Sequence, residues 1–309
     1  MTAYFILTAY TFNRAHPSPN IIKENNMPTF TNKATLSYNG IITESNTVTG
    51  NIAETLSVTK LVLDDTYTRD DRLTYVINIV NSGTTSFSDL TLTDDLGGYA
   101  LGGETVYPLE YVEDSLLYLI NGAAVADPTV TAGLPLSLGG ISVPAGGNAT
   151  VIYQTDVTDA APLDVDGFIT NTVTVTGTGI VEPLRASVTV NALEAPVLSI
   201  TKALSPTTVP ENGTVTYTFV ISNSGNVGAE ATDNAVVSDL FDPILNITSV
   251  TLDGAPLSLG TGYTYNTATG LFETVAGVIT VPAATYTQNP DGSFSVTPGT
   301  TVLTVTGTI

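Results

Sequence analysis

The chain has 309 residues, of which 12% are charged, and its 29 Asp and Glu against 8 Lys and Arg give a formal net charge of −21. A negative charge of this size repels phosphate backbones and anionic lipid surfaces, so nucleic acid is not an expected partner. No apolar run approaches the roughly 18 residues of a membrane span. The chain has no Cys and a single histidine, His16, which excludes disulfides, thiolate metal sites and a Ser-His-Asp or Cys-His catalytic arrangement on a folded domain.

Thr, Val, Gly, Ser and Asn are abundant in the sequence. β-Branched side chains suit a pleated surface, while Gly and Asn supply turns. No segment has convincing helical periodicity. We therefore predict an all-β protein, and the length allows two β-sandwich domains of roughly 100 to 140 residues each.

Residues 1–26 are predicted to be an N-terminal extension. The segment has no recognisable signal peptide, because a basic start is missing and its apolar stretch is short and broken by Thr. The run YFILTAYTF is either a docking strand or part of a leader, since an apolar β-prone run left in water is an aggregation liability. Export by another route, or release when the producing cell lyses, is expected.

Residues 27–55 are predicted to be a hairpin that donates a strand. Asn39-Gly40 separates two alternating runs, and this dipeptide suits a type I′ turn. The first run places one set of side chains on a single face, namely Phe30, Asn32, Ala34, Leu36 and Tyr38.

Residues 56–195 are predicted to be a complete domain, and residues 196–309 a second copy that lacks its last strands. LSVTKLVLDDTYTRDDRLTYVINIVNSG from Leu56 matches LSITKALSPTTVPENGTVTYTFVISNSG from Leu198. ISVPAGGNATVIYQTDVT from Ile141 is matched with FSVTPGTTVLTVTGTI from Phe294, where the sequence stops. The first copy continues through FITNTVTVTGTG and RASVTVNA.

The final strands of the second copy have a counterpart at the start of the chain. TFTNKATLSYNGIITESNTVTGNI from Thr29 is similar to the end of the first copy, with Asn32 aligned on Asn171. The sequence therefore predicts a repeat array cut out of phase, with a final hairpin first, then one complete domain, then one domain that needs a hairpin.

The motifs SITKALSPTTVPENGTVTYTFVISNSGN, VVSDL and ITNTVTVTG resemble the bacterial surface repeat known as domain of unknown function eleven. The resemblance covers roughly residues 29 to 309. It implies immunoglobulin-like β-sandwiches with a structural role in the cell envelope. A weaker resemblance connects the chain with spore-associated proteins of anaerobic Firmicutes.

The alternation of side chains along each strand predicts that three polar residues of the first domain point inward. Lys60 shares a strand face with Leu56, Asp94 with Leu92, and Asn171 with Val173. A buried Lys or Asp is costly unless it is paired, so the trio needs a reason. The same alternation predicts a second trio, made by Lys202, Asp239 and Asn32 of the displaced hairpin.

These trios resemble the intramolecular isopeptide sites of Gram-positive adhesin domains. The resemblance implies that burial favours a neutral amine beside a protonated acid, so that the amine attacks the Asn carboxamide and ammonia leaves. The alternative is an unreacted, hydrogen-bonded Lys-Asp pair capped by Asn.

The predicted function is a structural, non-enzymatic subunit of an extracellular or spore-surface fibre, which polymerises head to tail with copies of itself by donor-strand complementation. The alternative is a monomeric cell-envelope adhesin or S-layer-type module whose hairpin closes its own second domain. A glycan-degrading enzyme would need a cleft with paired carboxylates, to which nothing in the strand pattern points. No cofactor and no metal site are expected.

Overall fold

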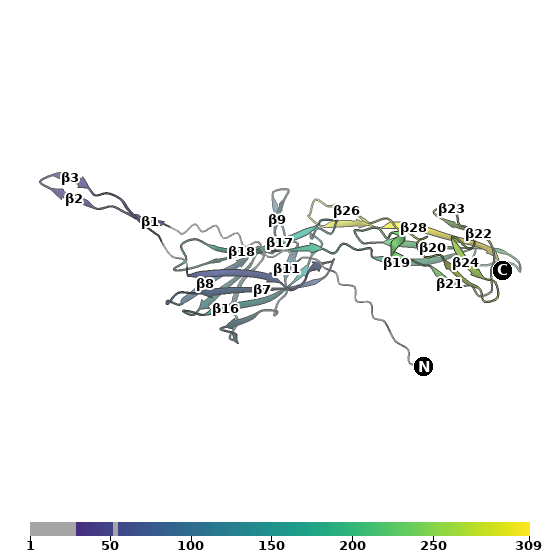
Figure 1. The fold of residues 1–309 in the computed structure, drawn as a ribbon, viewed down its shortest axis with the longest axis horizontal. Coiled ribbons are helices and arrows are strands. Elements are labelled where there is room, and N and C mark those ends of the chain that lie inside the picture. The colour runs from purple at the N-terminus through teal and green to yellow at the C-terminus, as the bar shows by residue number, and fades with distance from the viewer. Residues whose placement is uncertain (1–28, 52–54) are drawn as a thin grey trace, which may run out of the picture. The chain divides into compact units, whose positions relative to one another are not determined.

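The computed structural model describes residues 29–51 and 55–309, which are built almost entirely of β-strands (Figure 1). In these ranges the only helical element is the 3₁₀ turn η1 (Ala231–Asp233). The predicted all-β class is confirmed. The chain divides into two compact units, Met1–Glu54 and Thr55–Ile309. His16 and the run YFILTAYTF lie outside the described residues.

The first unit contains the predicted hairpin. Strands β1 (Thr29–Asn32) and β4 (Val48–Asn51) pair antiparallel, as do β2 (Thr35–Tyr38) and β3 (Ile41–Glu44). Both turn residues have positive φ, 48° at Asn39 and 79° at Gly40. That combination defines the type I′ turn predicted from the dipeptide.

Domain one, residues 56–195, is a sandwich of two sheets. The first sheet has the order β13 (Ala123–Ala124), β12 (Leu117–Ile120), β16 (Asn148–Val157), β7 (Arg72–Asn81), β5 (Leu56–Val62), with β11 (Leu109–Tyr111) also on β16. The second has the order β14 (Thr129–Gly133), β15 (Leu136–Val143), β8 (Phe87–Asp94), β17 (Phe168–Thr176), β18 (Leu184–Ala192), β6 (Thr66–Tyr67). A small ladder joins β9 (Tyr99–Leu101) and β10 (Glu104–Val106).

This strand order is that of an immunoglobulin-like sandwich. β5, β7 and β16 take the places of strands A, B and E, while β8, β17 and β18 take those of C, F and G. The inward face of β7 carries Leu73, Tyr75, Ile77 and Ile79, each at most 1% exposed. The period-two pattern of the sequence therefore identified the core face correctly.

Domain two, residues 196–309, repeats the first of these sheets but only part of the second. Its large sheet has the order β19 (Leu198–Ser205), β20 (Thr214–Asn223), β28 (Gly299–Thr308), β22 (Asn246–Leu252), β23 (Ala255–Pro256). Facing it is a small sheet of β21 (Ser238–Leu240), β25 (Leu271–Thr274) and β24 (Tyr263–Asn266). A separate ladder pairs β26 (Thr285–Gln288) with β27 (Phe294–Thr297).

One alignment made from the sequence is wrong in its first half. The Asn81 side chain donates to the carbonyl of Pro144 (3.0 Å), and its counterpart Asn223 donates to the carbonyl of Pro282 (3.1 Å). Pro282, and not the segment from Phe294, is therefore the equivalent of Pro144. The ladder β26–β27 is an insertion between this proline and β28, which does correspond to β16.

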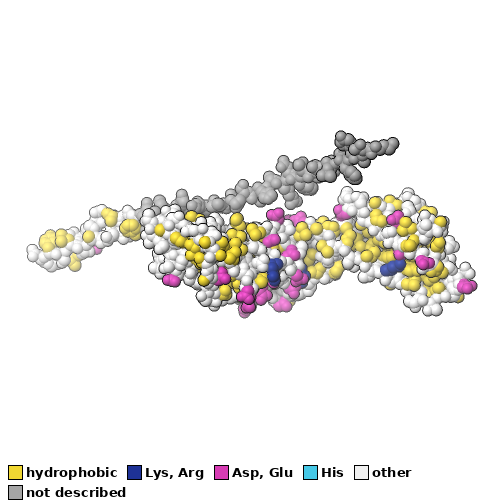
Figure 2. Space-filling view, turned by 90° about the horizontal axis from the view of Figure 1, so that it is seen from below, with side chains coloured by type: hydrophobic (Ala, Val, Ile, Leu, Met, Phe, Trp, Pro, Cys, Tyr) yellow, Lys and Arg dark blue, Asp and Glu magenta, His cyan; other side chains and the backbone are white. Residues whose placement is uncertain are grey.

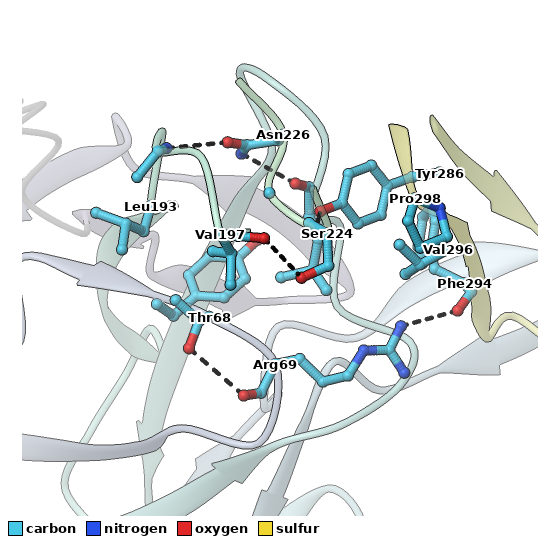
Figure 3. Close-up of a pocket in the computed structure, with 14 residues that line it drawn as sticks. Thr68, Arg69, Leu193, Val197, Ser224, Asn226, Tyr286, Phe294, Val296 and Pro298 are labelled. Atoms are coloured by element: carbon cyan, nitrogen blue, oxygen red, sulfur yellow. Dashed lines mark hydrogen bonds between the residues drawn. The ribbon is translucent and has the colours of Figure 1, made fainter. Parts of the chain in front are cut away.

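The inserted ladder joins domain two to domain one. The Phe294 amide donates to the carbonyl of Asp159 (2.8 Å), and the Arg69 guanidinium donates to the carbonyl of Phe294 (2.9 Å; Figure 3). The Gln288 amide donates to the Tyr99 hydroxyl (2.6 Å). These bonds fix the contact between the sandwiches through a segment that domain one lacks.

Candidate functional site

The strongest candidate site is a polar cluster inside domain one. Lys60 comes from β5, Asp94 from the end of β8 and Asn171 from β17, so three strands of two sheets supply it. Their exposed fractions are 4%, 0% and 0%. The structure therefore places all three predicted residues in the core, as strand parity required.

Asp94 is the centre of the cluster. The Lys60 ammonium and the Tyr153 hydroxyl both donate to its Oδ2 atom, and the Leu96 amide donates to Oδ1 (3.0 Å). The Lys60 nitrogen also lies 4.8 Å from the centroid of the Tyr75 ring. Both oxygens of the carboxylate thus accept hydrogen bonds, and all three side chains of the trio are buried.

Asn171 differs from the other two residues because its carboxamide is unpartnered. Neither Nδ2 nor Oδ1 makes a hydrogen bond within the described residues, although both are buried. Burial raises the pKa of Tyr75 and of Tyr153, the two tyrosines next to the trio. A buried amide without partners costs about 1–3 kcal/mol, so this one needs an explanation.

Burial sets the protonation of the amine. Desolvation lowers the pKa of Lys60, and the Asp94 charge opposes the shift without cancelling it. A Lys amine with a lowered pKa is more often neutral and therefore nucleophilic. The cluster can thus supply a nucleophile, a carboxyl group to move a proton, and a carboxamide to be attacked.

The lowered pKa predicts a pH dependence that can be measured after Asn171→Leu has removed the carboxamide. In the window between the lowered folded pKa of Lys60 and its ordinary pKa of 10.5, the unfolded chain binds the extra proton. The free energy of unfolding should therefore rise with pH in this window and stay level below it.

Urea unfolding of Asn171→Leu and of Asn171→Leu/Lys60→Met across pH 7 to 10 isolates this effect, since both variants share the same tyrosines. The difference in unfolding free energy between them should change with pH in the stated sense. A difference that is constant over the whole range would contradict the lowered pKa.

Domain two holds the corresponding pair without the third member. Lys202 on β19 donates to Asp239 on β21 and lies 4.6 Å from the centroid of the Tyr217 ring. However, the Lys202 side chain is 41% exposed and that of Asp239 17%. The predicted inward direction holds, and both side chains are more exposed than those of Lys60 and Asp94, which are 0% exposed.

The difference has a simple structural cause. In domain one, β18 packs against β5 and β17 pairs with β8. In domain two, every residue of β19 is exposed, and among the described residues β21 pairs with β25 alone. The strand edge and the sheet face that the last two strands cover in domain one are therefore open in domain two.

The hairpin presents the matching surface. Phe30 and Leu36 are 55% and 60% exposed, whereas Ile169 and Val175, their aligned counterparts in β17, are 2% and 0% exposed. Hydrophobic side chains gather along the hairpin in Figure 2. Lys33 and Glu44 form an ion pair on the other face. The hairpin is therefore amphipathic, with an exposed apolar face.

Sequence reasoning missed the two tyrosines of the cluster. Tyr75 and Tyr153 stack with ring centroids 5.7 Å apart and pair across β7 and β16. Their inward parity was a usable signal. In domain two Tyr217 repeats Tyr75, but the residue paired with it is Val305, so the second pair lacks the tyrosine that donates to the carboxylate.

The other features of residues 29–51 and 55–309 offer no catalytic arrangement. A groove of about 530 Å³ between the sandwiches is lined mainly by apolar side chains, and its Arg69 is bound to Asp159 and Phe294. Within the described ranges there is no group of three or more potential metal ligands. None of the helical structure described there is long and apolar enough to cross a membrane.

Comparison with known proteins gives similarity of fold alone. No family model and no curated protein matches the chain. Among solved structures, the variant BcpA*(D312A) of the major pilin subunit of Bacillus cereus is 10% identical with a TM-score of 0.36, over 88% of this chain and 73% of the pilin. The pilus backbone RrgB from Streptococcus pneumoniae is 10% identical with a TM-score of 0.32, over 82% and 50%.

A family 123 glycoside hydrolase from Clostridium perfringens is matched at a comparable level, 13% identity and a TM-score of 0.28, over 46% of this chain and 28% of the enzyme. The chain spans about half the length of RrgB and less of the hydrolase. Similarities this low assign no function, which has to follow from the residues of the chain itself.

Proposed function

We propose that the chain is a structural, non-enzymatic subunit of a fibre at an extracellular, cell or spore surface, in which residues 29–51 of one copy complete domain two of the next. One observation carries the proposal. The same chain holds a sandwich with an open strand edge and a hairpin whose exposed apolar face matches the strands that close the other sandwich.

The alignment of Asn32 with Asn171 fixes the register of the docked hairpin. In domain one Val173 lies opposite Asp94, and Val175 opposite Leu92. The equivalent pairs are Ala34 with Asp239 and Leu36 with Val237. Docking then satisfies the free backbone groups of β21 and buries the apolar face of the hairpin, which is the mode called donor-strand complementation.

Chain geometry favours donation to another copy over self-closure. The hairpin joins domain one at Thr55, whose carbonyl accepts from Ser82 beyond the C-terminal end of β7 (2.8 Å). Arg69, which contacts domain two, precedes the other end of β7. The ten residues of β7 span about 33 Å, whereas residues 52–54 bridge at most about 14 Å.

The direction of the docked hairpin adds to this distance. β18 ends where domain one meets domain two, since its Ala192 pairs with Tyr67 beside Arg69. A hairpin docked in the same way would end at the side of domain two farthest from domain one. In the monomeric adhesin or S-layer alternative, Asn51 would have to lie at this far side of domain two while Thr55 lies at the end of domain one that is opposite domain two. Donation between copies is a heterologous contact, which propagates into a filament.

The test uses two substitutions on opposite faces of the hairpin. Leu36→Asp should abolish filaments in negative-stain microscopy, because it places a charge in the core of domain two. Ile42→Asp is the matched control, since Ile42 is 69% exposed and lies on the face of Lys33. It should leave the filaments intact. Equal assembly of both variants would overturn strand donation.

We further propose that domain one is closed by an isopeptide bond between Lys60 and Asn171, with Asp94 assisting. The lowered pKa of the amine and the unpartnered carboxamide support this proposal. Such a bond would tie the first strand of the sandwich to a strand near its end. The chain would then resist unfolding under tension along the fibre.

A further inference from the structure

The pair Lys202–Asp239 in domain two is an incomplete copy of the buried cluster in domain one. It has the amine, the carboxylate and the aromatic ring under the amine, and among the described residues of domain two no carboxamide takes the place of Asn171. The site is incomplete without a group from elsewhere.

The hairpin of another copy would supply this group. In domain one, Asn171 stands two residues before Val173, the residue opposite Asp94, and on the same face of β17. In the docked register Asn32 stands two residues before Ala34, the residue opposite Asp239. The Asn32 carboxamide would therefore enter domain two at the position that Asn171 occupies in domain one.

We infer that Lys202 forms an isopeptide bond with Asn32 of a second copy after the hairpin of that copy has docked, so that assembly makes each joint of the fibre covalent. This inference rests on the strand donation proposed above, and it adds the chemistry of the joint. It also assigns the exposed Asn32 a role that docking through apolar contacts would not require.

The reaction is balanced without any co-reactant. The neutral amine of Lys202 attacks the Cγ atom of Asn32, a C–N bond forms, and the bond from Cγ to Nδ2 breaks. The carboxyl group of Asp239 hydrogen-bonds the carboxamide oxygen and passes the amine proton to the departing nitrogen. The products are a secondary amide and one molecule of ammonia.

The exposure of the free pair makes the reaction dependent on assembly. With 41% of its side chain exposed, Lys202 is hydrated in the undocked chain. Docking covers β19 and removes this water, as β18 does for β5 in domain one. Nucleophile and target thus become reactive together only at a correctly formed joint.

The test compares filaments of full-length chains before and after boiling in detergent. Wild-type filaments should run as a ladder of multiples of the chain, and tandem mass spectrometry should find Lys202 joined to Asn32 with the loss of one ammonia. Lys202→Met, Lys202→Arg and Asn32→Ser should still form filaments in negative stain but run as single chains after boiling. Lys33→Met changes the opposite hairpin face and should retain the ladder.

An equal mixture of Lys202→Met and Asn32→Ser chains gives the most specific test of the bond. Only the Asn32 of the first variant can react with the Lys202 of the second, so boiled samples should contain covalent dimers and no larger species. Wild-type filaments that dissolve entirely into single chains would overturn the bond while leaving strand donation in place. The absence of filaments from the wild-type chain would remove both.

Discussion

A chain that is kept monomeric by Leu36→Asp is expected to be lighter than its sequence by the mass of one ammonia molecule, and adding Lys60→Ala should restore the full mass. The same substitution should lower the free energy of unfolding of domain one by about 3–5 kcal/mol, the usual cost of leaving a buried charge without its partner. The reason is that Asp94 is 0% exposed and loses its hydrogen-bond partner, the Lys60 nitrogen. Loss of the covalent closure would add to this cost.

Intact-mass spectrometry and urea unfolding check the two parts separately. Lys202→Ala in the same monomeric background is the matched control, because it breaks the same pair type where the amine is 41% exposed. Its cost should be about 1 kcal/mol or less, as for exposed ion pairs. Full mass in a folded parent chain would rule out the bond in domain one, and equal costs for both lysines would contradict the role of burial.

Adding a peptide of residues 27–54 to a chain that begins at Thr55 is expected to raise the unfolding temperature of domain two by about 10 °C or more. At a hundredfold excess over its dissociation constant, a ligand that binds only the folded state adds about 2.7 kcal/mol. For a domain of this size each kcal/mol corresponds to a shift of roughly 4–8 °C. The gain comes from covering β19 and the free edge of β21.

Differential scanning calorimetry can follow this shift, provided that the two domains unfold in separate transitions. The peptide with Leu36→Asp should have no effect, and the transition of domain one should not move, because its own β17 and β18 already fill the place. A shift of domain one, or an equal shift with the altered peptide, would count against specific docking.

The sequence by itself determined the strands, their buried faces and the positions of the polar trio. These properties depend on the local alternation of apolar and polar residues along each strand, as the buried row from Leu73 to Ile79 illustrates. The repeat also identified Asn32 as the counterpart of Asn171, because aligned strands of the same fold have their inward-facing residues at the same positions. The turn at Asn39-Gly40 likewise depends only on its own two residues.

Only the tertiary structure decided which of these residues are sealed from water and which remain unpartnered. Strand parity predicts the same environment for Lys60 and Lys202, yet one side chain is 0% and the other 41% exposed, because burial depends on a neighbouring strand distant in the sequence. Three other features could not be predicted for the same reason. They are the unpartnered Asn171, the replacement of Tyr153 by Val305 in the second copy, and the insertion β26–β27. Each depends on which strands, far apart in the sequence, lie next to one another, and the alternation within a single strand does not specify that.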